Sequence, residues 1–146
     1  MKTIDINCDM GEGMGNEDAI MPYISSCNIA CGGHAGDALI LKSTVDLAMK
    51  HEVKIGAHPS YPDKKNFGRQ VMKISSEDLT TTIEDQIKAL KIITESSGGK
   101  LHHIKPHGAL YNEAAKDKNT AEAVLNAINN FDTEFTLYAP YKSVIA

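Results

Sequence analysis

Four of the six histidines lie in segments that contain glycine, proline or lysine, at the ends of short apolar runs. One is His58 in the sequence Gly-Ala-His-Pro, and the others belong to the segment His102-His-Ile-Lys-Pro-His-Gly108. Imidazole groups titrate near neutral pH and bind metal ions, so this placement favours chemistry over a purely structural role. Three more polar side chains alternate along an early apolar segment, at Asp5, Asn7 and Asp9. Together these residues predict a polar pocket at one end of a sheet.

The elements that would position these residues follow from the apolar pattern. Five runs have the length of β-strands, at residues 3–8, 24–30, 53–57, 101–105 and 134–139. Three segments have the periodicity of amphipathic helices, at residues 38–51, 76–97 and 120–130. Strands that alternate with helices indicate an α/β fold with a largely parallel sheet and covering helices. A chain of 146 residues suits one such domain.

The expected helix ends have chemical causes. Ser75 offers a capping hydroxyl with Asp78 three residues further on, which is typical of a helix start. Gly98-Gly99 can adopt left-handed conformations and so end the same helix. We also expect Asp37 and Asn119 to cap the other two helices.

Side chains alternate between the two faces of a strand, so residues two positions apart lie on the same face. In the first predicted strand Asp5, Asn7 and Asp9 point to one side, although a strand covered on both faces should be apolar on both. In the fourth, Lys105 shares a face with His103. Ligands of parallel α/β proteins bind beyond the carboxyl ends of the strands. We therefore expect a site where three such ends meet, at Asp9, His58 and His107.

Two other segments leave alternatives open. Arg69 is the only arginine, and it either clamps a carboxylate or phosphate or is an ordinary surface charge. Cys27, Cys31 and His34 have a spacing that zinc could use, but small buried cysteines at a strand end are the favoured interpretation. His34 itself lies among glycines before a helix, where backbone amides can receive an anion.

Composition excludes several classes of function. The net charge of −4 and the absence of a basic stripe argue against a nucleic-acid partner. The first residues lack the apolar run of a secretory signal and no stretch has the length of a membrane span, so we expect a cytoplasmic protein with no membrane partner. The glycines at 11–15 lack the last glycine of a dinucleotide loop, and Asp9 and Glu12 would repel a pyrophosphate. The three cysteines are expected to be free thiols.

Five blocks of sequence carry a resemblance to a known family: Asp5-Ile-Asn-Cys-Asp-Met-Gly-Glu12, Asn28-Ile-Ala-Cys-Gly-Gly-His-Ala-Gly-Asp37, Gly56-Ala-His-Pro-Ser-Tyr-Pro-Asp63, Phe67-Gly-Arg69 and His102-His-Ile-Lys-Pro-His-Gly-Ala-Leu-Tyr111. With these blocks the chain closely resembles the LamB/YcsF family, whose members are understood as A subunits of 5-oxoprolinase. The resemblance is specific over residues 4–112 and extends in looser form to the last residue.

The resemblance implies a partial or distorted β/α barrel related to carbohydrate deacetylases. It also implies ATP-dependent opening of the lactam of 5-oxo-L-proline (pyroglutamate) to L-glutamate, together with two partner subunits. ATP is then a cofactor, and a divalent metal either accompanies it as Mg²⁺ or occupies the site. Complete barrels have roughly 250 residues, so we expect this chain to be the N-terminal portion of a longer barrel. The open sheet edge would lead to self-association, to a partner that covers it, or to impaired activity.

Lactam opening needs a polarised or phosphorylated oxygen, an activated water and a protonated leaving nitrogen. We place four residues in catalytic roles, with Asp9 as general base, His58 and His107 as acid–base groups, and Lys105 stabilising the oxyanion. We place five around the substrate, at Asp5, Asn7, His34, Arg69 and His103. A bound metal is left open, with Asp9, His58 and His107 as candidate ligands. The alternatives are a metal-dependent amide or deacetylase-type hydrolase acting alone and a non-catalytic binding subunit.

Overall fold

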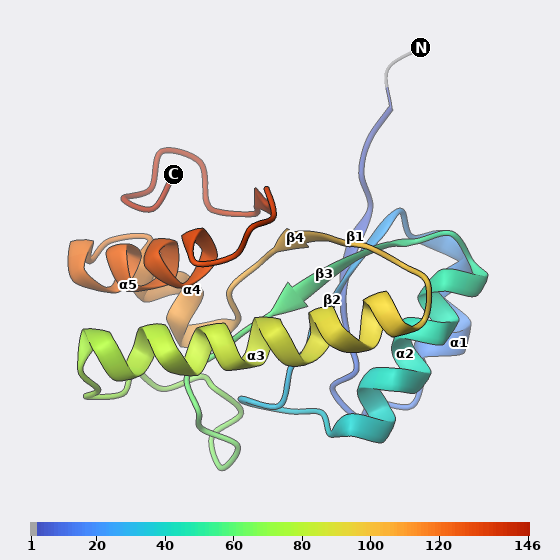
Figure 1. The fold of residues 1–146 in the computed structure, drawn as a ribbon, viewed down its shortest axis with the longest axis horizontal. Helices are drawn as coiled ribbons and strands as arrows, with labels where there is room; N and C mark the ends of the chain where they lie inside the picture. Colours follow the sequence, from blue (N-terminus) through green and yellow to red (C-terminus); the bar gives the residue numbers. More distant parts are fainter. Residues whose placement is uncertain (1–2) are drawn as a thin grey trace.

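Five parallel strands lie side by side in the order in which they occur along the chain (Figure 1). The computed structural model describes residues 3–146. The strands are β1 (Asn7–Met10), β2 (Ser26–Ala30), β3 (Lys54–His58), β4 (Leu101–Ile104) and β5 (Thr136–Leu137). Each crossover moves the chain to the next strand in one direction, as in a β/α barrel that is only partly formed. The expectation of a parallel α/β fold is confirmed.

The long helices cover one face of this sheet. Helix α2 (Ala38–Lys50) packs on β2 and β3, and α3 (Ser76–Ser96) packs on β3, β4 and α5 (Lys118–Asn129) (Figure 1). The buried apolar side chains of the helices pack against the strand side chains that point towards them. Ile29, Ile55 and Ile104 are completely or almost completely buried in this layer. Burial of this apolar surface is the main stabilising contribution to the fold. No helix within residues 3–146 is both long and apolar enough to cross a membrane.

Two of the expected helix caps are confirmed and one is wrong. The Asp37 carboxylate accepts hydrogen bonds from the amides of Leu39 and Ile40, each at 2.9 Å. The Ser75 hydroxyl accepts from the Asp78 amide at 3.1 Å, and Gly98 has a φ of +81° just beyond α3. Asn119 does not cap α5. Asp117 does so instead, because its carboxylate accepts from the Thr120 amide at 2.8 Å and the helix begins at Lys118.

Several element bounds differ from the apolar pattern. Strand β1 begins at Asn7 rather than residue 3. Of residues 3–6, only Ile6 forms backbone hydrogen bonds with the neighbouring chain, where its carbonyl oxygen accepts from the amides of Ser25 and Ser26. Strand β5 is shortened to two residues. Three short helices add to the expected elements: α1 (Glu17–Ile20), the 3-10 helix η1 (Met21–Tyr23) and α4 (Gly108–Ala114). They are too short to show a helical period in the sequence.

The face of the sheet opposite the helices carries polar side chains. In register across neighbouring strands lie Asp9 of β1, Asn28 of β2, Gly56 of β3 and His103 of β4. Asn28 and His103 are fully buried, although neither lies in the apolar core. This row, called the polar layer below, supports the site at the carboxyl ends of the strands.

Candidate active site

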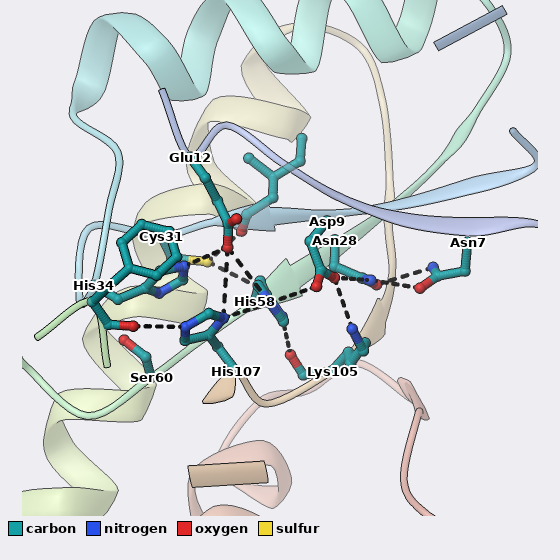
Figure 2. Close-up of polar contacts among 12 residues, drawn as sticks. Asn7, Asp9, Glu12, Asn28, Cys31, His34, His58, Ser60, Lys105 and His107 are labelled. Carbon is teal, nitrogen blue, oxygen red and sulfur yellow. Dashed lines mark hydrogen bonds and ion pairs between the residues drawn. The ribbon is translucent and has the colours of Figure 1, made fainter. Parts of the chain in front are cut away.

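The carboxyl ends of β1, β3 and β4 bring together charged and imidazole side chains from distant parts of the sequence (Figure 2). His58 is the last residue of β3, Lys105 follows β4 directly, and His107 precedes the first residue of α4. Asp9 belongs to β1. Hydrogen bonds from the Lys105 amide to the Ala57 carbonyl and from the His107 amide to the Pro59 carbonyl fix these segments against each other.

Asp9 is held as a carboxylate by its neighbours. Its Oδ1 accepts hydrogen bonds from Lys105 Nζ at 2.7 Å and from Asn28 Nδ2 at 2.8 Å. Its Oδ2 lies 3.5 Å from His58 Nε2. Burial by itself raises the pKa of Asp9, but the contacts with His58, Lys105 and Asn28 outweigh burial and hold the pKa far below its ordinary value. Asp9 is therefore ionised at neutral pH.

Glu12 joins three histidines in a second group, called the Glu12 cluster below. Its Oε1 lies 2.9 Å from His34 Nε2, 3.5 Å from His107 Nδ1 and 4.0 Å from His58 Nε2. The three imidazoles are buried, and the ring of His34 stacks on that of His107 at 3.6 Å. Together the four side chains offer ligand atoms that lie within 4.8 Å of one another, so they could hold a metal ion.

Burial controls the protonation of the Glu12 cluster. It lowers the pKa of His34, and with the nearby His34 and His58 it lowers the pKa of His107 to about 4. Burial alone would raise the pKa of Glu12, but the hydrogen bond and charge of His34 more than compensate and lower it. The cluster therefore combines an ionised carboxylate with neutral imidazoles at His34 and His107, which is the state that metal ligands need.

Two backbone carbonyls fix the tautomers of two of these rings. His58 Nδ1 lies 2.6 Å from the Lys105 carbonyl oxygen, and His107 Nε2 lies 2.8 Å from the Phe67 carbonyl oxygen. A carbonyl oxygen only accepts hydrogen bonds, so both of these nitrogens must carry a proton. In the neutral rings His58 Nε2 and His107 Nδ1 are then unprotonated and face the interior of the site.

Asn28 links Asp9 to the polar layer. Its amide nitrogen donates to Asp9, and its amide oxygen lies 2.7 Å from His103 Nε2. A reciprocal pair of hydrogen bonds joins it to Asn7, at 2.6 and 3.1 Å. Because the Asp9 carboxylate can only accept, it sets the orientation of the Asn28 amide, which in turn requires a proton on His103 Nε2. Asp5 lies nearby, where it accepts hydrogen bonds from Ser26 and from the Tyr138 hydroxyl.

The buried imidazole of His103 makes stability depend on pH. Burial, aided by the adjacent His102, lowers the pKa of His103 from 6.5 to about 4. Between these values the unfolded chain binds a proton at this residue and the folded protein does not. Stability is therefore complete above pH 6.5 and falls as the pH drops towards 4. We expect His103 to account for a loss of roughly 2–3 kcal/mol in the free energy of unfolding.

Urea unfolding at a series of pH values would measure this effect. The matched variant His103→Gln keeps a polar side chain that does not titrate, so its stability should vary less between pH 6.5 and 4. Equal pH dependence in the two proteins would show that His103 does not carry the effect.

The structure places most of the residues singled out from the sequence in one region. Asp9, His58, Lys105 and His107 contact one another, and His34 stacks against the last of them. Asp5, Asn7 and His103 lie next to them in or beside the polar layer. The structure therefore brings these residues together, while the pocket and the chemical roles of the residues stay predictions.

Arg69, Cys8 and Cys27 lie outside this group, whereas Cys31 adjoins it, because its Sγ accepts a hydrogen bond from the His58 amide at 3.3 Å. The guanidinium of Arg69 is exposed and lies 5.2 Å from the centre of the Phe67 ring, so a role in substrate binding stays a prediction. All three thiols are free, as expected. Burial raises the pKa of Cys27 and of Cys31 to about 12, which disfavours the thiolate that zinc requires. His34 pairs with Glu12 and not with these cysteines.

Two residues of the site do not stand out in the sequence. Apart from its place in the first block of the family resemblance, Glu12 enters the sequence analysis only as a charge that would repel a pyrophosphate, because the direction of its side chain after Gly11 cannot be inferred from the sequence. Asn28 lies within a segment that has the apolar character of a buried strand. One signal does point to it: Ser26 and Asn28 alternate along that strand in the same way as Asn7 and Asp9 do along the neighbouring one.

A parallel sheet in sequential order, with an acid, a lysine and imidazoles at its carboxyl ends, is the architecture of a partly formed β/α barrel. The sequence pattern of the LamB/YcsF family matches residues 4–146. The chain belongs to this family. Curated relatives are named as the A subunit of 5-oxoprolinase: one from Bacillus cytotoxicus is 48% identical over 143 residues, and one from Geobacillus thermodenitrificans is 49% identical over 142 residues.

These relatives are longer than the chain. The match covers 94% of this chain but only 57% of the Bacillus cytotoxicus protein and 56% of the Geobacillus thermodenitrificans protein. A solved structure, the lactam utilization protein from Thermus thermophilus, superposes with a TM-score of 0.95 at 39% identity. That similarity covers 99% of this chain and 60% of the solved one.

Proposed function

We propose that this chain acts in the ATP-dependent opening of 5-oxo-L-proline to L-glutamate, as the A subunit of a 5-oxoprolinase. The names of the relatives support the reaction and the requirement for partner subunits. The observation that carries the proposal for the site is the ionised Asp9 between Lys105 and His58, at the carboxyl ends of the strands. We further propose that the 146 residues form one domain, which corresponds to the N-terminal portion of the longer barrel of the relatives.

The site residues suit hydrolysis of a poorly electrophilic lactam. Asp9 takes a proton from water as the water oxygen adds to the lactam carbon, and the Lys105 ammonium stabilises the negative charge that develops on the lactam oxygen. The tetrahedral intermediate then collapses with cleavage of the carbon–nitrogen bond. The proton that Asp9 has taken from water passes to the unprotonated Nε2 of His58, 3.5 Å from Asp9 Oδ2, and this imidazole or that of His107 delivers it to the leaving nitrogen, which becomes the amino group of glutamate.

The remaining predicted residues are assigned to substrate binding. Asp5, Asn7 and His103 lie in or beside the polar layer next to Asp9, and we assign them to substrate binding. His34 and Arg69 are assigned to the substrate carboxylate. Phosphorylation of the lactam oxygen by ATP, with Mg²⁺, would release ADP and make the lactam carbon a better electrophile for water. The phosphate would leave by hydrolysis after the carbon–nitrogen bond has broken, and two partner subunits complete the enzyme.

Reconstitution tests this proposal. We expect glutamate to form from 5-oxoproline only when the chain, the partner subunits and ATP are all present. His107→Ala removes one acid–base group and should lower the rate of glutamate formation about 100-fold or more. His51→Ala is the matched control, because His51 lies at the end of α2 away from the site. Equal rates in the His107 variant and the parent would contradict the assignment of this site.

A second candidate function is a metal-dependent amide hydrolase that needs neither ATP nor partners. The Glu12 cluster is the specific observation in its favour, because three imidazoles and a carboxylate suit a hydrolytic metal. Hydrolysis of simple amides or acetylated sugars by the isolated chain without ATP would favour this candidate. Binding of 5-oxoproline with no turnover in any mixture would instead indicate a non-catalytic binding subunit.

A further inference from the structure

Two unprotonated nitrogens face each other inside the Glu12 cluster. His107 Nδ1 and His58 Nε2 are only 3.0 Å apart, and the carbonyls of Phe67 and Lys105 hold the ring protons on the opposite nitrogens. In neutral rings this contact brings one lone pair against another, with no hydrogen between them. Such a contact is repulsive unless a proton or a metal ion lies between the two atoms.

One carboxylate oxygen of Glu12 and one of Asp9 lie near these two nitrogens, and their negative charge favours a cation there. Glu12 Oε1 lies 3.5 Å from His107 Nδ1 and 4.0 Å from His58 Nε2. Asp9 Oδ2 approaches His58 Nε2 from the other side, at 3.5 Å. The Lys105 ammonium does not supply the missing charge here, because its hydrogen bond goes to Asp9 Oδ1.

His34 supplies an independent observation. The residue is only 2% exposed, its Nε2 contacts Glu12, and its Nδ1 is buried without a hydrogen-bond partner. Because Nδ1 makes no hydrogen bond, it does not hold the ring in place, and its burial without a partner is unfavourable. The position of the ring is determined instead by the contact of its Nε2 and by its stacking on His107. The ring therefore directs Nε2 towards the same point as the other two imidazoles.

The spacing of the four atoms agrees with a single ion. Bonds of about 2.0–2.1 Å at tetrahedral angles separate ligand atoms by roughly 3.3–3.4 Å. Four of the six separations are 2.9, 3.0, 3.5 and 4.0 Å, which bracket this value, and all six are within 4.8 Å. The carbonyls behind His58 and His107 also match the outer hydrogen bonds that orient histidine ligands in metal sites.

We propose that Glu12 Oε1, His34 Nε2, His58 Nε2 and His107 Nδ1 bind one divalent ion of the zinc type. Imidazole nitrogens with one carboxylate select zinc-like ions over magnesium or calcium, which prefer oxygen ligands. The site goes beyond the proposed function, which needs Mg²⁺ only with ATP. When bound, the ion supplies Lewis acidity next to Asp9. His58 and His107 would then serve as ligands, and Asp9 would return the proton it takes from water to the leaving nitrogen.

Metal titration of the isolated chain tests the site without any activity assay. After treatment with a chelator, the protein is titrated with Zn²⁺ by calorimetry and with Co²⁺ by visible absorption. We expect one ion per chain in both experiments. Glu12→Gln and His34→Gln preserve size and polarity, and each should weaken Zn²⁺ binding at least 100-fold, as expected for loss of a direct ligand.

Two matched controls separate this site from surface binding. Glu17→Gln alters a nearby carboxylate in α1, and His51→Gln alters a histidine at the end of α2, so both should bind Zn²⁺ like the parent. Circular dichroism of every variant checks that it is folded. A folded parent that binds no Zn²⁺, or equal affinity in the parent and the two cluster variants, would overturn the proposal. Either result leaves the reconstitution experiment on the proposed function unaffected.

Discussion

Replacing Asp9 by asparagine is expected to lower the turnover of the reconstituted enzyme by about 10²- to 10⁴-fold. Asparagine keeps the shape of the side chain, and its amide oxygen can still accept the hydrogen bonds from Lys105 and Asn28. It cannot accept a proton from water, and it removes the negative charge between Lys105 and His58. Steady-state measurement of glutamate release would give the loss directly.

A control for this substitution is Asp46→Asn, which removes an equally charged carboxylate that pairs with Lys42 on the exposed face of α2. Exposed ion pairs contribute little, so both turnover and stability should stay close to those of the parent. If the Asp9 variant turned over as fast as this control, Asp9 would not be the general base. Thermal unfolding of both variants would separate a catalytic loss from a folding defect.

Replacing Gly56 by alanine is expected to lower the free energy of unfolding by roughly 2–4 kcal/mol. Gly56 lies between Asn28 and His103 in the polar layer, and the His103 ring crosses the space where a side chain would be. A Cβ atom at this position would lie 2.1 Å from His103 Nε2, far inside contact distance. The ring must then move, which breaks its hydrogen bond to Asn28 and leaves buried polar atoms without partners.

A double-mutant cycle identifies the cause of this loss. In a His103→Ala background the space above Gly56 is free, so Gly56→Ala should cost well under half as much as in the parent. Urea unfolding of the four proteins supplies the cycle. The same cost in both backgrounds would mean that the backbone of β3, and not the ring of His103, excludes a side chain at this position.

The fold is largely predictable because its elements have strong periodic signals. Helix α3 has a buried apolar stripe over 21 residues, a hydroxyl cap and a terminal glycine, all of which are local in sequence. Helix α4 has seven residues, too few for a period, and its first residue Gly108 has a φ of +54° that only the tertiary structure explains. The predicted cap of α5 lies two residues too far along the chain, because Asp117 and Asn119 are chemically similar candidates.

The candidate site is predictable to the extent that strand geometry determines it. Alternation along β1 and β4 directs Asp9 and Lys105 to one side, and parallel strands bring their carboxyl ends together. Glu12 belongs to a turn, where no period indicates the direction of a side chain. The tautomers of His58 and His107 depend on carbonyls at Lys105 and Phe67, and such long-range backbone contacts have no signal in the sequence.

Lys105 serves two partners through different atoms. Its ammonium binds Asp9, whereas its carbonyl oxygen orients the ring of His58. Every amino acid at position 105 provides the carbonyl, but only lysine provides this ammonium. Mutagenesis can therefore delete the charge and retain the alignment of the neighbouring imidazole. In this protein electrostatic and orientational contributions of a single residue are genetically separable.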